Sequence, residues 1–286
     1  MRRDSRPELI EVSAAAWSCE LPALSTDSVA DMRTIGGMAT ILPASLLLTA
    51  CGATDEEAST KPPAAASTPS AEPAAQVEPL PFNAGGYLGG TAQPNLGDGE
   101  PGEVSVVQVG PLDAVSGTLI FAFRNNTSDG ISHVDWTATA RSGGSIVATG
   151  SSQGTTPAQL QPGEVGLAYI FFENADAIPA DSEYEFEVST SPVDTSPYNT
   201  APLTVNEANV SGDAIVGSAT NATGVETVGP YAVSVYCFEG DSLVSSLITF
   251  AEQTDEVVDG GTVTFSASLF GEPCPTFSVG VSGYFS

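Results

Sequence analysis

Histidine and basic residues are scarce in this sequence. It contains one histidine, His133, and seven lysines and arginines against 35 acidic residues, so its formal net charge is −28. One histidine excludes a metal site built from several of them, and a Ser-His-Asp triad would have to use this one. The sequence also contains no Gly-x-Ser-x-Gly turn, no Gly-x-x-x-x-Gly-Lys phosphate loop and no Asp-x-Asp-x-Asp-Gly calcium loop. These absences argue against an enzyme, and we expect His133 to be a surface residue at a strand edge.

Acidic residues that lie close together are the remaining candidates for catalysis. Asp255-Glu256, or the alternating Glu183, Glu185 and Glu187, could in principle act as the two carboxylates of a glycoside hydrolase. A solvated acidic strand face would show the same alternation. We therefore predict no catalytic residue, no metal site and no cofactor, and keep a secreted hydrolase that uses surface carboxylates as an alternative.

The charge balance also restricts the partners. From Cys51 to Ser286 there are 29 acidic residues against three basic ones, a net charge of about −26. Such a surface repels nucleic acid phosphates and anionic lipid headgroups and attracts cations. We expect no nucleic acid partner, weak cation binding at most, and a protein or glycan partner if there is one.

No hydrophobic run is long enough to span a membrane as a helix. The most apolar stretch, residues 32–51, has one charge at its start, Arg33, and is interrupted by Gly36, Gly37 and Pro43. A charged start, a short apolar middle and small residues before the end are typical of a secretory signal. We therefore predict a signal peptide over residues 32–50.

The end of this signal, Leu48-Thr49-Ala50-Cys51, resembles the lipobox of prokaryotic lipoproteins. The resemblance implies that a diacylglyceryl group is attached to the sulfur of Cys51 and that cleavage makes Cys51 the first residue. Two or three acyl chains hold a protein firmly to a bilayer, because each buried methylene contributes about 0.8 kcal/mol. The prediction is an exported protein, lipid-anchored to the outer face of the cell membrane, or to the outer membrane in a diderm host. The alternative is an ordinary signal peptide with a chance cysteine.

The segments on either side of the signal differ in composition. Residues 1–31 carry six acids, whereas the leading region of a signal is basic, so we interpret them as a mis-assigned leader with Met32 as the start. A genuine long leader is the alternative. After Cys51, residues 52–81 are rich in Ala, Pro, Ser and Glu and lack aromatics, which predicts a disordered tether over 51–81. Residues 82–102 are rich in glycine and predict an irregular lead-in to the folded part.

From residue 103 the pattern changes to a period of two, which indicates antiparallel strands with one buried face. No window of a dozen residues predicts an amphipathic helix. The fold class is therefore all-β: two tandem immunoglobulin-like sandwiches, over 103–190 and 203–286, joined by a linker at 191–202. The predicted strands are 104–109, 117–124, 132–140, 145–149, 164–172, 183–189, 203–208, 214–220, 231–238, 242–250, 262–270 and 276–284.

The two sandwiches read as copies of one domain, because five blocks match in order. The matched blocks are 125–127 with 221–223, 136–140 with 233–237, 143–147 with 240–244, 160–165 with 258–263, and residues 184, 186 and 188 with 277, 279 and 281.

The order of strands and turns resembles the FxLYD-type immunoglobulin-like domains of prokaryotic surface lipoproteins. The name-giving Phe-x-Leu-Tyr-Asp is absent, and the corresponding stretches read Thr-Ala-Thr-Ala-Arg at 137–141 and Val-Tyr-Cys-Phe-Glu at 235–239. The family implies a surface sandwich of mostly unassigned role and brings no catalytic residues.

Four cysteines are present: Cys19, Cys51, Cys237 and Cys274. If Cys19 is removed with the leader and Cys51 is lipidated, the even remainder in an exported chain indicates a disulfide between Cys237 and Cys274. That bridge would contribute about 3–4 kcal/mol in the chain-entropy model.

Two further expectations concern single residues. Trp136 should occupy the core of the first sandwich. Four asparagines, Asn125, Asn126, Asn209 and Asn221, head Asn-x-Ser/Thr triplets, which are glycosylation candidates in a host with that pathway and turn residues otherwise. Together the sequence predicts a non-catalytic binding or envelope-structural lipoprotein, with an accessory subunit of a transport or secretion complex as a further alternative.

Overall fold

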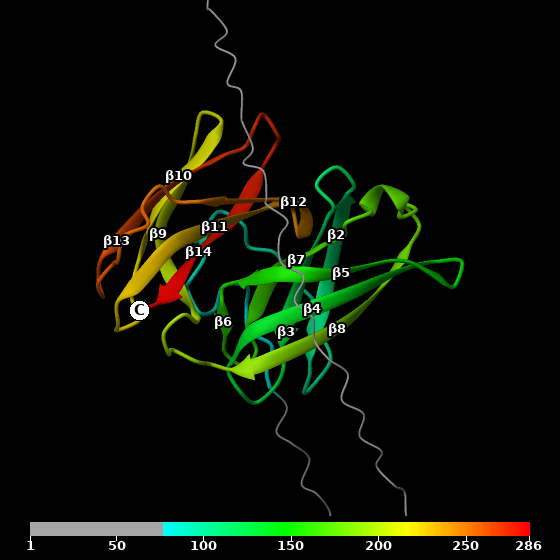
Figure 1. Cartoon of the computed structure of the whole chain (residues 1–286), viewed down its shortest axis with the longest axis horizontal. Coiled ribbons are helices and arrows are strands. Elements are labelled where there is room, and N and C mark those ends of the chain that lie inside the picture. Colours follow the sequence, from blue (N-terminus) through cyan, green and yellow to red (C-terminus); the bar gives the residue numbers. More distant parts are fainter. Residues whose placement is uncertain (1–76) are drawn as a thin grey trace, which may run out of the picture. The chain divides into compact units, whose positions relative to one another are not determined.

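The computed structural model describes residues 77–286 (Figure 1). The predicted leader, signal peptide, lipidation site at Cys51 and most of the tether lie outside these residues. The described part is all-β, with strands β1 to β14 and one short 3-10 turn, Ala175–Ala177. None of residues 77–286 forms a helix capable of crossing a membrane. The strands form two curled antiparallel sheets, as the sequence predicts.

The first sheet is continuous from one half of the sandwich to the other because strand β5 pairs with a neighbour in each half. Its residues 145–151 pair with β4, and residues 151–156 pair with β7. The strand order is β2-β3-β7-β5-β4-β6, with β8 on the other side of β4. The strands are β2 (Val104–Asp113), β3 (Thr118–Asn125), β4 (Ile131–Ser142), β5 (Ser145–Thr156), β6 (Gln159–Leu160), β7 (Val165–Phe171) and β8 (Glu183–Pro192).

In the second sheet, β9 is the strand that pairs with a neighbour in each half. Residues 200–203 of β9 pair with β14, and residues 204–211 pair with β10. The order is β12-β11-β14-β9-β10-β13, and the short strand β1 (Gly89–Gly90) is added to β14. The other strands are β9 (Thr200–Ser211), β10 (Ala214–Thr220), β11 (Thr227–Glu239), β12 (Ser242–Phe250), β13 (Thr262–Ser268) and β14 (Thr276–Phe285).

Alternation along β4 builds the core of the first sandwich. Val134, Trp136 and Ala138 are buried, whereas Asp135 and Thr137 are exposed, so successive side chains point to opposite faces. The ring of Trp136 packs edge-on against three phenylalanines, with centroid distances of 5.3 Å to Phe121, 5.2 Å to Phe123 and 6.2 Å to Phe186. Trp136 is therefore a core residue, as expected.

All twelve predicted strands are present, but several boundaries differ. The largest difference is in β5, which was predicted to end at Thr149 and continues to Thr156. The run Gly-Ser-Ser-Gln-Gly reads as a turn. In the fold, Gly150 permits the strand to lie against β7, since a Cβ there would come within 2.4 Å of the Phe171 carbonyl oxygen. Close packing of the backbone thus overrides a local turn signal.

The pairing registers of the two sandwiches correspond residue by residue, which supports the interpretation of two copies. Trp136 faces Val188 as Val233 faces Val281, and the hairpin partners of β4 and β11 carry a bulge at equivalent residues, Val147 of β5 and Val244 of β12. Further equivalent pairs are Ala138 with Phe186 and Val235 with Val279, and Ala140 with Tyr184 and Cys237 with Phe277.

The lead-in is irregular but buried, which composition did not indicate. Four of its apolar residues, Phe82, Leu88, Ala92 and Leu96, form a third hydrophobic cluster with side chains from both sandwiches. Those side chains are Ile120, Ala122, Val165 and Leu167 of the first copy and Tyr236, Phe238 and Leu243 of the second. The lead-in therefore acts as a shared part of the core and not as a spacer.

The predicted end of the tether at Pro81 also needs correction. Leu80 already donates its N–H to the Gly163 carbonyl, at 3.0 Å, and its own carbonyl accepts from Arg124, at 2.7 Å. Leu80 thus belongs to the folded part, because its backbone groups have partners in the first sandwich.

Candidate functional site

A groove of about 560 Å³ lies between the two sandwiches, and we call it the inter-sandwich groove. Its sides come from the β2–β3 hairpin of the first copy, and from β12 and the β13–β14 turn of the second. The lining residues are Pro111, Leu112, Asp113, Val115, Thr118, Ile120, Cys237, Val244, Ser245, Ser246, Leu247, Leu269, Phe270, Glu272 and Pro273. Most of them are apolar, which is typical of a binding hollow.

Two large apolar side chains at the rim are highly exposed. Val115, at the tip of the β2–β3 hairpin, is 98% exposed, and Phe270, in the β13–β14 turn, is 79% exposed. Because they belong to different copies, they border the groove on opposite sides. Exposed apolar groups that gather at one hollow indicate an interaction surface.

The groove lies beside two edge strands. Strand β12 pairs only with β11, and β2 pairs only with β3. At one end the edges are joined by the side-chain amide of Gln108, which donates to the Asp241 carbonyl at 2.9 Å and accepts from the Leu243 N–H at 2.8 Å. Beyond Leu243, four consecutive residues of β12, 244–247, border the groove.

The turn that carries Phe270 is held in place at several points. Asp213 accepts the Leu269 N–H through its backbone carbonyl, at 2.8 Å, and the Gly271 N–H through its carboxylate, at 2.9 Å. A disulfide joins Cys237 of β11 to Cys274, which follows this turn, with a Cα–Cα distance of 5.1 Å. Cys237 itself lines the groove. The disulfide between Cys237 and Cys274 thus supports one wall of the groove.

The charge at the groove is negative. The carboxylate of Asp113 accepts hydrogen bonds from the Ser116 hydroxyl, at 2.6 Å, and the Val115 N–H, at 2.9 Å, and these lower the pKa of Asp113. Glu272 on the opposite side is exposed. Residues 77–286 contain two basic residues, Arg124 and Arg141, and neither lines the groove.

Arg124 instead fixes the lead-in to the first sandwich. It is buried, and its guanidinium donates to the carbonyls of Leu80 at 2.7 Å, Gly163 at 2.6 Å and Gly97 at 3.2 Å. Burial lowers the pKa of Arg124, with the charge of Asp98 acting in the opposite direction. Three main-chain contacts of this kind give the arginine a structural role.

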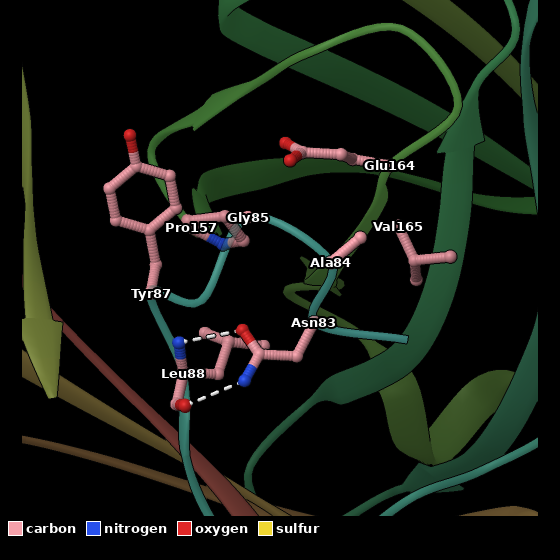
Figure 2. A pocket seen from close by; sticks show the side chains of 8 residues that line it. All are labelled: Asn83, Ala84, Gly85, Tyr87, Leu88, Pro157, Glu164 and Val165. Carbon is pink, nitrogen blue, oxygen red and sulfur yellow. Dashed lines mark hydrogen bonds between the residues drawn. The ribbon is translucent and has the colours of Figure 1, made fainter. Parts of the chain in front are cut away.

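A second hollow, much smaller, lies under the lead-in at Glu164 (Figure 2). Its volume of about 10 Å³ is room for one water molecule. One side is a turn in which the Asn83 amide bonds the backbone of Leu88 in both directions, at 2.7 and 2.9 Å. Burial raises the pKa of the Glu164 carboxyl, although the N–H of Gln161 donates to it at 2.8 Å and opposes that rise. This hollow is too small for a ligand.

The Asn-x-Thr triplets at 125 and 221 are structural in both copies. Each asparagine is fully buried. The Asn221 amide donates to the carbonyls of Val225 and Val257, both at 2.8 Å, and its oxygen accepts from the Thr223 N–H and hydroxyl, at 3.1 and 2.7 Å. Asn125 makes the same four contacts with Asp129, Leu160 and Thr127. Neither is accessible for glycosylation.

The other two triplets differ in exposure. Asn126 is buried and donates to the carbonyls of Asp98, at 2.6 Å, and Glu100, at 3.2 Å. Asn209, near the end of β9, is exposed. Among the four candidates it alone is open to a modifying enzyme.

The candidate catalytic groups are exposed at the surface. His133 is exposed, with a φ of 45° at an irregularity in the β4–β8 pairing, and its Nε2 hydrogen-bonds to Asn199. The glutamates of β8 point outward, and Glu185 pairs with Arg141 at 2.7 Å. Asp255 and Glu256 are exposed. Within residues 77–286, no three side chains of His, Cys, Asp or Glu come together as metal ligands.

No signal in the sequence identified the inter-sandwich groove. Its residues are spread from position 111 to position 273, and they meet only once the two copies are placed side by side. No family model matches this chain, and no curated protein matches it.

Proposed function

We propose that the protein is an exported lipoprotein, held at the outer face of a membrane through Cys51, with a non-catalytic binding role in the cell envelope. The observation that carries the binding role is the inter-sandwich groove: an apolar hollow with two exposed apolar side chains at its rim. The signal-like segment at 32–50 and the Leu-Thr-Ala-Cys sequence at 48–51 support the anchor.

The position of the groove is consistent with an anchored binding protein. The described chain starts at Val77, where Leu80 bonds the Gly163 turn next to the end of β3 at Asn125. The groove uses the opposite end of β3, at Thr118. Eight strand residues span about 26 Å, so the hollow is separated from the point where the tether enters.

Metabolic labelling in the host with an alkyne fatty acid tests the anchor. The wild-type chain should incorporate the label and remain with membranes, and Cys51→Ser should lose both properties, since the thiol is the attachment point. Cys19→Ser is the matched control and should behave as the wild type, because Cys19 precedes the proposed cleavage site. Label that persists in Cys51→Ser, or its absence from the wild-type chain, would refute the anchor.

A further inference from the structure

We propose that the inter-sandwich groove binds an extended basic segment of a partner protein, which adds to the outer edge of β12 as an extra strand. The inference rests on the non-catalytic binding role proposed above and is independent of the lipid anchor. Three features of the groove support it: an open strand edge, apolar walls and an acidic rim.

The open edge is the part of β12 beyond Leu243. An edge strand presents alternate backbone N–H and C=O groups outward, where another strand can pair with them. Residues 244–247 line the groove consecutively, so the backbone borders it together with the side chains. Within the described residues β11 is the only strand paired with this segment.

The side chain of Gln108 shows that the edge of β12 can hydrogen-bond an amide group in both directions. This side chain has the same donor and acceptor as a peptide bond, and it pairs with the Asp241 carbonyl and the Leu243 N–H immediately before the open segment. An added strand would pair beyond the bulge at Val244, along residues 245–247. Peptides bind in this way at exposed sheet edges, with affinity from the main chain and specificity from pockets for alternate side chains.

The apolar walls match one face of such a strand. Leu112, which packs against the first core, and Leu247 and Leu269, which pack against the second, line the groove half-buried. Val115 and Phe270 line it exposed. Phe270 has a φ of 53°, a conformation that is unfavourable for a bulky side chain. The contacts of Asp213 nevertheless hold this turn with its aromatic ring toward solvent. Every second side chain of a bound strand would contact this surface.

The negative charge of the chain favours a positively charged partner segment. Asp113 and Glu272 border the groove, and residues 77–286 carry 25 acidic residues against two basic ones. A second copy of the chain would bring the same negative charge, and residues 52–76 are acidic and rich in proline. A segment that alternates basic and apolar residues satisfies both the charge and the edge.

Fluorescence anisotropy with the full chain and a labelled nine-residue peptide of alternating lysine and valine tests the proposal. We expect saturable binding. A glutamate–valine peptide should bind at least about tenfold more weakly, because its charge repels the rim. A lysine–valine peptide with alternate backbone amides methylated should also lose about tenfold, because it keeps its charge but not its strand pairing. Hydrogen exchange should slow at residues 245–247 in the complex.

Two variants at the rim identify the site. Phe270→Asn removes the aromatic ring from a position where asparagine tolerates positive φ, and Val115→Lys adds a repelling charge at a fully exposed position. Each should weaken binding about fivefold to tenfold. Tyr198→Asn is the matched control: it is 87% exposed with a φ of 72°, lies outside the groove, and should leave affinity unchanged.

Three outcomes would overturn the proposal. If the methylated and unmethylated lysine–valine peptides bind with equal affinity, the peptide is held by charge attraction and does not pair with the strand. Equal affinity in wild type and Phe270→Asn would place the peptide elsewhere. Self-association in sedimentation that Phe270→Asn abolishes would make a second copy the occupant. None of these results bears on the labelling of Cys51, so the two proposals fail separately.

Discussion

Asn125 and Asn221 show how a single buried amide determines a turn in this fold. Each bonds one carbonyl and two donors of its own loop and a second carbonyl, that of Leu160 or Val257, 35 or 36 residues further along the chain. Its backbone carbonyl accepts from the N–H of Gly163 or Gly260. The sequence marked both triplets but left open whether they were modification sites or turns. Their burial decides in favour of turns, because an asparagine with no exposed surface cannot meet a modifying enzyme.

Replacing Asn221 by alanine should therefore cost about 2–3 kcal/mol of unfolding free energy. The carbonyls of Val225 and Val257 would each lose one of their two partners, and the Thr223 N–H would lose its acceptor. Asn209→Ala, at an exposed triplet, should stay within about 0.5 kcal/mol of wild type. Denaturant unfolding of both variants gives the comparison, and equal stability would show that the amide network contributes nothing.

Glu164 should make stability depend on pH in an unusual direction for an acid. Burial raises its folded pKa above the ordinary value of 4.5, so the folded state binds the proton more tightly than the unfolded one. Stability from this group is present below pH 4.5 and is lost as the pH rises through the folded pKa. Glu164→Gln removes this titration and keeps an acceptor for the Gln161 N–H.

The free energy of unfolding of Glu164→Gln should accordingly increase relative to that of wild type as the pH rises from 4 to 7. Urea unfolding at a series of pH values measures this difference. Glu187→Gln, at an exposed position on β8, controls for the loss of one negative charge. A stability difference between Glu164→Gln and wild type that is flat across this range, or that has the opposite slope, would contradict the assignment.

Among the elements, the lead-in is the one whose burial the sequence predicts least well. Its glycines and prolines correctly predicted little regular structure, and only Gly89–Gly90 forms a strand. Composition could not show that four of its apolar residues are buried, because their partners lie 24 to 161 positions further along the chain. Glycine here has a packing role: a Cβ at Gly90 would lie 2.2 Å from the Phe277 carbonyl oxygen.

Gly90→Ala should thus destabilise the protein by about 3 kcal/mol or more, because it combines a φ of 106° with a backbone clash. Gly102→Ala is the matched control, with a φ of 80° and no atom within 4 Å of the new methyl group, and should cost about 1 kcal/mol. Thermal unfolding of the two variants measures the difference in their stability losses. Equal costs would mean that the contact between β1 and β14 is not maintained in solution.

The regular elements were predictable because their signal is local. Period-two alternation identified all twelve long strands, and matched blocks anticipated equivalent registers in the two copies. Strands β1 and β6 were missed since two residues carry no period. The groove was missed for a different reason: neither copy alone forms it.

For the described part as a whole, the third hydrophobic cluster joins the two sandwiches through the lead-in. Phe238 of the second copy lies edge-on to Phe82 of the lead-in, with ring centroids 6.0 Å apart, in a cluster that also contains Leu167 of the first copy. A shared core of this kind couples the unfolding of its members.

Calorimetry should consequently show one main unfolding transition. Phe238→Ala should lower the free energy of unfolding by about 3–5 kcal/mol and move this transition to a lower temperature. Phe250→Ala, at a ring that is 60% exposed in the same sheet, should have little effect. Two separate transitions, of which Phe238→Ala shifts only one, would show that the sandwiches unfold independently.

The attachment of the chain at Cys51 is the claim on which its place in the cell depends. Intact mass spectrometry of the protein isolated from host membranes tests it most directly. We predict a chain that begins at Cys51 and carries a diacylglyceryl group on its first residue. A chain that retains residues 32–50, or one that begins at an unmodified Cys51, would contradict it.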